Sequence, residues 1–294
     1  MKFASPICAG LMIVLLAGCD RPLKDDRPAG PVTPIPAALK AGPLEQAKAE
    51  LAKNPAAATM TDAGGNTALH YATYNGQLEL VELLLSKGAD ADARNKNGQN
   101  CLHRSVNSSN AAITKLMLNE GLNVNGRDTF GRTPLMMALM GGHPNIVQLL
   151  LENKADPRIR NQDGMSAYHQ AAGAENPDLL AVMLKSNPDL NDRDKWGNTL
   201  LHISAEAGMV ANAKLLVEAK ASLTATNGMG STPLQSVQAV QGQARVGGHD
   251  AVENYLRQLA GLPPLEPKSK SKSKQKSKQA PKAEGDAATP SEPK

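Results

Sequence analysis

The chain has 294 residues, of which 41% are hydrophobic and only 2% aromatic. This composition supports a buried core but disfavours a deep sandwich or barrel, which need more rings and β-branched side chains, and it favours packed helices. The net charge is +4, and the segment 268–294 alone contributes +5. A near-neutral body with a basic tail makes a nucleic-acid-binding domain unexpected.

Residues 1–18 have the layout of a signal peptide. Lys2 supplies a positive start, and the apolar run 11–16 is too short for a stable membrane span. The run continues into the sequence Leu-Ala-Gly-Cys, which ends at Cys19 and resembles the lipobox of bacterial lipoproteins. The resemblance implies cleavage before Cys19, a diacylglycerol on its thiol and a fatty acid such as palmitate on the new N-terminus. The alternative is a plain secretory signal with a chance cysteine.

The segment 19–36 is predicted to be a linker between this anchor and the folded body. It carries five prolines, which exclude a helix and favour an extended polyproline conformation. At about 3.1 Å per residue, the linker would hold the body roughly 50 Å from the bilayer. Asp20 resembles the signal that retains lipoproteins in the inner membrane, so we expect a periplasm-facing protein of the bacterial envelope, on the inner membrane rather than the outer.

Glycines recur every 33 residues through the middle of the chain. An apolar residue follows each glycine after four positions, and small residues keep the same register three positions later. The glycines are Gly65, Gly98, Gly131, Gly164, Gly197 and Gly230. Such strict periodicity predicts a repeat protein, in which each unit packs mainly on its neighbours.

Each unit is predicted to contain two helices and a loop. Thr133 suits an N-cap and Pro134 suits the first helical turn. The second helix is apolar almost all round, as at 146–151, so it must lie between neighbouring units. A Gly-Ala-Asp turn, as at 88–90, then ends it. The period, the Thr-x-Leu-His segment and this turn resemble the ankyrin repeat. The resemblance implies an all-α ankyrin-repeat solenoid of six units over residues 62–262.

Both ends of the predicted solenoid depart from the pattern, as capping units do. At the N-terminal end, Leu44, Ala47 and Leu51 predict an amphipathic capping helix within residues 37–61. In the last unit, a seven-residue insertion between Val237 and Gly247 lengthens the first helix or its turn. The fold is expected to end near residue 261, and residues 263–294 form a disordered tail rich in Lys and Ser.

The histidines are expected to be structural. Four share the position after the ankyrin leucine, where the resemblance implies hydrogen bonds between adjacent repeats, and two begin a second helix. Cys101 is expected to be a small packing residue rather than a redox sensor. Because no metal-ligand spacing, phosphate-binding loop or nucleophile motif is visible, we expect no cofactor, no metal site and no catalytic residues, and hence a protein that is not an enzyme. The histidines are His70, His103, His169 and His202, then His143 and His249.

A partner-binding surface is predicted on the concave face that the resemblance implies. The residue before each repeat glycine points to that face in ankyrin proteins. Beyond Cys19, the one Phe and the one Trp of the chain both occupy this position. Rigid aromatic and methionine side chains with a polar rim are typical of binding hot spots. The alternative is that these side chains only stiffen the loops. The predicted partner-binding residues are Phe130, Trp196, Met229, Met140, Met165, Arg132 and Tyr74.

Two functions remain open from the sequence. The first is a membrane-anchored protein–protein interaction module, acting as a scaffold, an inhibitor or immunity-type protein, or a helper of an envelope enzyme. The second is a structural spacer of the envelope, whose Lys-rich tail contacts anionic lipids or other polyanions weakly. In both cases we expect a monomer that is tethered by its lipid anchor and does not bind nucleic acid.

Overall fold

The computed structural model describes residues 35–240 and 247–265, and the helices described here lie in one unit that ends at Pro264. Fourteen α-helices and one short 3-10 helix account for its regular structure, and the described residues form no strand beyond a single bridge between Thr61 and Thr67. The predicted all-α fold is confirmed. The predicted signal peptide, Cys19, most of the linker and most of the tail lie outside the described residues.

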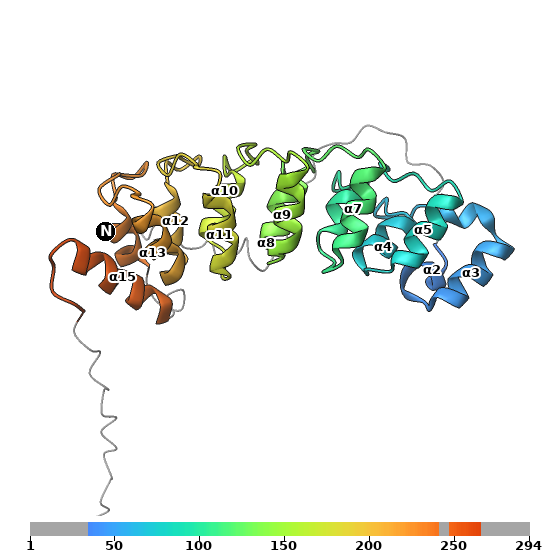
Figure 1. The fold of residues 1–294 in the computed structure, drawn as a ribbon, viewed down its shortest axis with the longest axis horizontal. Coiled ribbons are helices and arrows are strands. Elements are labelled where there is room, and N and C mark those ends of the chain that lie inside the picture. The colour runs from blue at the N-terminus through green and yellow to red at the C-terminus, as the bar shows by residue number, and fades with distance from the viewer. Residues whose placement is uncertain (1–34, 241–246, 266–294) are drawn as a thin grey trace, which may run out of the picture. The chain divides into compact units, whose positions relative to one another are not determined.

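Six helix pairs follow the glycine period (Figure 1). The first helices of successive pairs contact one another, and so do the second helices, which gives the two packed rows of a helical-repeat solenoid. The pairs are α4 (Ala68–Tyr74) with α5 (Leu78–Ser86), α6 (Cys101–Ser105) with α7 (Ala111–Asn119), α8 (Pro134–Met140) with α9 (Pro144–Glu152), α10 (Ala167–Ala172) with α11 (Pro177–Leu184), α12 (Leu200–Glu206) with α13 (Val210–Glu218), and α14 (Pro233–Ala239) with α15 (Gly247–Leu259).

The N-terminal capping region contains two α-helices where the sequence predicted one. The expected helix is α3 (Leu44–Lys53), which buries Ala47 and Leu51. A short helix α2 (Ala37–Ala41) precedes it, and the 3-10 helix η1 (Pro55–Ala58) follows. Since α2 packs on α4 and α3 packs on α5, the cap repeats the two-row arrangement of the units that it covers.

The seven-residue insertion does not lengthen the first helix of the last unit. Helix α14 has seven residues, as do α8 and α12. The extra residues therefore follow Ala239, and the segment 241–246 lies outside the described residues.

The helices begin where the sequence supplies a capping side chain. The backbone N–H of Met136 donates to Thr133 Oγ1 at the start of α8, and that of His103 donates to Asn100 Oδ1 at the start of α6. These bonds satisfy amide groups that have no partner within a helix. Because such a residue recurs every 33 positions, each first helix starts in the same register.

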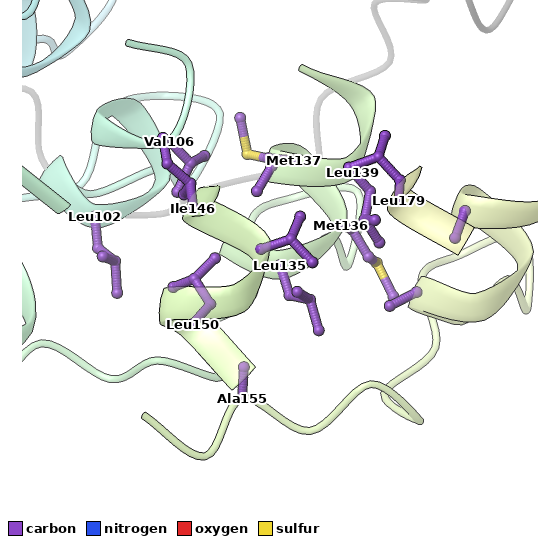
Figure 2. Packing of buried hydrophobic residues seen from close by; sticks show 14 of the residues in the cluster. Leu102, Val106, Leu135, Met136, Met137, Leu139, Ile146, Leu150, Ala155 and Leu179 are labelled. Carbon is purple, nitrogen blue, oxygen red and sulfur yellow. The ribbon is translucent and has the colours of Figure 1, made fainter. Parts of the chain in front are cut away.

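The core consists of aliphatic and methionine side chains placed between successive helix pairs. Figure 2 shows Leu135 and Met136 of α8 beside Ile146 and Leu150 of α9, and all four side chains are buried. Burial of apolar area contributes about 25 cal/mol for each Å², and this is the main favourable term in the folding free energy of such a stack. No helix within residues 35–240 and 247–265 combines the length and the apolarity that crossing a bilayer requires.

Two of the four buried histidines, His70 and His202, link adjacent units. In His70, Nδ1 accepts the backbone N–H of Thr67 at 3.1 Å, so the proton lies on Nε2, which is 3.0 Å from the carbonyl oxygen of Gln99 in the next unit. His202 makes the corresponding bond to the carbonyl oxygen of Ser231 in the next unit. His103 Nε2 bonds instead to the carbonyl oxygen of Gly126 in the loop of its own unit, and His169 Nε2 has no hydrogen-bond partner within the described residues. Burial lowers the pKa of all four rings, and that of His103 to about 4.

A row of four arginines joins the loops. Each guanidinium donates to the carbonyl oxygen of the residue 33 positions later, so every arginine reaches into the next unit. These bonds satisfy carbonyl groups that no helix or sheet uses. The donors are Arg94, Arg127, Arg160 and Arg193, and the last of them bonds to the carbonyl of Thr226.

Candidate functional site

The residue before each repeat glycine has its backbone fixed from two sides. Asp194 Oδ1 accepts the backbone N–H groups of Trp196 and Asn198 at 2.9 and 2.8 Å. The carbonyl oxygen of Trp196 accepts the N–H of Gly228, in the next unit, at 2.8 Å. Gly197 has a φ of 80°, and a Cβ there would lie 2.6 Å from that same nitrogen, so only glycine fits. The loop therefore holds the Trp196 backbone rigidly.

Four of the predicted residues come together around one groove with a cavity volume of about 900 Å³. Met140, Met165, Trp196 and Met229 all line it. The Trp196 side chain is 38% exposed and that of Met140 is 42% exposed, whereas Met165 is buried. A volume of this size can accept several side chains of a partner. We call this cavity the methionine–tryptophan groove.

The other three predicted residues lie outside the methionine–tryptophan groove. The Arg132 guanidinium lies 4.7 Å from the centre of the Phe130 ring and pairs with Asp128 at 2.8 Å. Tyr74 is 46% exposed, and the guanidinium of Arg104 lies 4.3 Å from the centre of its ring. The structure thus divides the predicted set between the groove and two arginine–aromatic pairs.

Small residues open the groove, and the sequence prediction did not include them. Gly173 lines the cavity and occupies the same repeat position as Met140 and Tyr74. A glycine there leaves unfilled the space that a side chain takes in the other two units. Comparing residues at the same repeat position would have revealed this gap. Ile203 and Leu179 also line the groove, and they were missed because they look like ordinary core residues.

Three charged side chains line the groove, namely Asp163, Glu175 and Lys195, and two of them are paired with each other. Lys195 forms an ion pair with Asp163, and its ammonium lies 4.3 Å from the centre of the Trp196 ring. The ammonium and the ring attract each other, which adds to the order of the exposed tryptophan. The groove therefore offers apolar side chains inside a polar rim, which is the anatomy of a protein-binding surface.

The groove contains no catalytic constellation within the described residues. His169 lines it, but its ring is fully buried and is held by Ser166, 2.9 Å from Nδ1. No group of three or more metal-ligating side chains occurs in the described parts of the chain. The thiol of Cys101 is buried, and burial raises its pKa, so it is a poor nucleophile.

Comparison with known proteins gave one finding about the family. The family model described as ankyrin repeats (3 copies) matches residues 7–95, 74–161 and 153–227. These matches together span more than half of the chain. A search of curated proteins gave no match.

Proposed function

The chain belongs to the ankyrin-repeat family, whose repeats are protein–protein interaction modules, and on this premise we propose that it binds a protein partner through the methionine–tryptophan groove while a lipid anchor holds it in the bacterial envelope. One observation carries the binding proposal. In a chain whose residues are only 2% aromatic, its single tryptophan is 38% exposed at an apolar groove.

Physical considerations support the groove as the binding site. Folding alone would place a tryptophan in the core, because a buried ring contributes more free energy than an exposed one. Methionine side chains adapt to irregular surfaces, and three of them line the groove. A rigid ring surrounded by adaptable side chains can seat the apolar side chains of a partner.

Replacing Trp196 by alanine is expected to weaken partner binding by at least about thirtyfold, because a central aromatic anchor contributes 2 kcal/mol or more. The free energy of unfolding should stay within about 1 kcal/mol of the parent, since the ring is partly exposed. Crosslinking in membranes recovers the partner. Titration of that partner against both proteins then gives the affinities, and urea unfolding gives the stabilities.

Leu259→Ala is the matched control, because Leu259 is 42% exposed but does not line the groove. Equal losses of binding in the two variants, or a collapse of stability in Trp196→Ala, would show that Trp196 packs the stack and that the site lies elsewhere. A function that survives Trp196→Ala but is lost when residues 268–294 are removed would instead favour the envelope spacer.

The anchor proposal rests on the lipobox resemblance, because Cys19 lies outside the described residues. Mass spectrometry of the protein isolated from bacterial membranes is expected to show an N-terminal peptide that begins at Cys19 and carries lipid. In Cys19→Ala this peptide should be absent and the protein should leave the membrane fraction. An unmodified N-terminal peptide that begins elsewhere would refute the anchor. Asp20 supports retention in the inner membrane, facing the periplasm.

A further inference from the structure

Arg104 carries a positive charge that no carboxylate among the described residues pairs with. Its guanidinium is partly buried and lies 4.3 Å from the centre of the Tyr74 ring. Its Nε is buried without a hydrogen-bond partner, and no carboxylate forms an ion pair with it, within the described residues. The carboxylate of Asp62 does not pair with Arg104; it accepts hydrogen bonds from the Tyr71 hydroxyl at 2.5 Å and from two backbone N–H groups.

Two other cations near the predicted surface are neutralised. Arg132 pairs with Asp128, and Lys195 pairs with Asp163. A charged group that loses water without gaining a partner costs free energy, and burial accordingly lowers the pKa of Arg104. Arg104 therefore differs from these two residues in having no carboxylate partner for its charge within the described parts of the chain.

Arg104 is placed in line with the methionine–tryptophan groove. It occupies the same repeat position as Ile203, which lines the groove, so both side chains come from the same face of their first helices. Helix α6 contacts α8, whose Met140 lies at the rim. Neighbouring helices pack about 8 to 10 Å apart, so one extended or helical segment can span Arg104 and the groove.

We propose that the partner presents an aspartate or glutamate side chain to the Arg104 guanidinium, which stacks on the Tyr74 ring, and that its apolar side chains enter the groove nearby. This inference rests on the proposed function. A guanidinium binds a carboxylate through two parallel hydrogen bonds, and stacking on the Tyr74 ring fixes the plane in which its N–H groups lie. The Lys-rich segment of the chain itself has the wrong sign of charge for this site. A single unpaired arginine is also too little for a nucleic acid, whose binding needs many phosphate contacts.

Selection from a displayed library of random 16-residue peptides, with the full-length chain in detergent as bait, tests this pairing. The enriched peptides are expected to combine apolar residues with Asp or Glu. Synthetic peptides from this selection should bind Arg104→Gln about tenfold to a hundredfold more weakly at low salt, since a charge-assisted bidentate contact is lost. A repeated selection against Arg104→Glu should enrich Lys or Arg in place of the acid.

Arg257→Gln is the matched control, because Arg257 is partly buried like Arg104 but pairs with Glu253 and does not line the groove, and the affinities of this variant should change less than about threefold. Helix content by circular dichroism confirms that the variants are folded, and Arg104→Glu gives an independent readout if Arg104→Gln is unstable. An acid preference that is absent, or that persists unchanged in Arg104→Gln, overturns the inference. So does Arg104-dependent binding to vesicles of anionic phospholipid without any acid-containing peptide.

The outcomes for this inference and for the proposed function are distinguishable. Loss of peptide binding in Trp196→Ala with no effect in Arg104→Gln supports the groove and refutes the acidic contact. A selection that enriches no peptide counts against both.

Discussion

Replacing Leu135 by alanine should cost the protein about 2 to 5 kcal/mol of its unfolding free energy. The Leu135 side chain is fully buried in the core beside Ile146 and Leu150 of α9 (Figure 2). Removing three carbon atoms there loses their transfer free energy and leaves a cavity that closely packed helices can fill only in part. Urea unfolding followed by circular dichroism measures the loss.

Leu234 provides the matched control, because it holds the same repeat position as Leu135 in the last unit and is only partly buried. Leu234→Ala should cost less than half as much as Leu135→Ala, since less apolar surface returns to water. Equal losses in the two variants would mean that burial within the stack does not set the stability of the individual units.

Replacing Glu206 by glutamine is expected to change how stability depends on pH. Burial raises the pKa of the Glu206 carboxyl from its usual 4.5 to about 7, Asp194 adds to the shift, and a hydrogen bond with Ser236 opposes it. Oxygen Oε2 has no hydrogen-bond partner within the described residues. The folded protein thus binds a proton that the unfolded chain releases, and its stability falls as pH rises from 4.5 through 7.

The glutamine variant removes this titration and keeps the shape of the neutral carboxyl. Its unfolding free energy should match that of the parent near pH 4.5 and exceed it by about 1 to 3 kcal/mol at pH 8, allowing for the water that still reaches the side chain. The lowered pKa of the buried histidines affects both proteins alike, so the difference isolates Glu206. A difference that stays constant between the two pH values would contradict the prediction.

Much of the fold is encoded in periodic features that a single sequence displays. Gly197 illustrates why the prediction succeeded, since its positive φ and its contact with the next loop allow no other residue. Helix α2 was missed, because five residues supply too little periodicity to distinguish a helix from the end of a proline-rich linker. Its position follows from packing on α4, which is a tertiary contact.

The candidate site was predicted only in part, for a related reason. The repeat register places Trp196, Met229 and Met140 on one face, but it does not show which neighbouring positions are empty. The opening at Gly173 and the pairing of Lys195 with Asp163 depend on side chains from adjacent units. The unpaired state of Arg104 is likewise visible only once the partners of Asp62 and Asp128 are known.

The row of arginines has a consequence for the energetics of recognition. Arg193 bonds to the carbonyl of Thr226, and the amide of Gly228 bonds to the carbonyl of Trp196, so two loops that carry groove residues are fixed to each other. The spacing between the Trp196 and Met229 backbones is therefore set before any partner arrives. Because such preorganisation reduces the conformational entropy lost on association, a groove of modest size can still bind tightly.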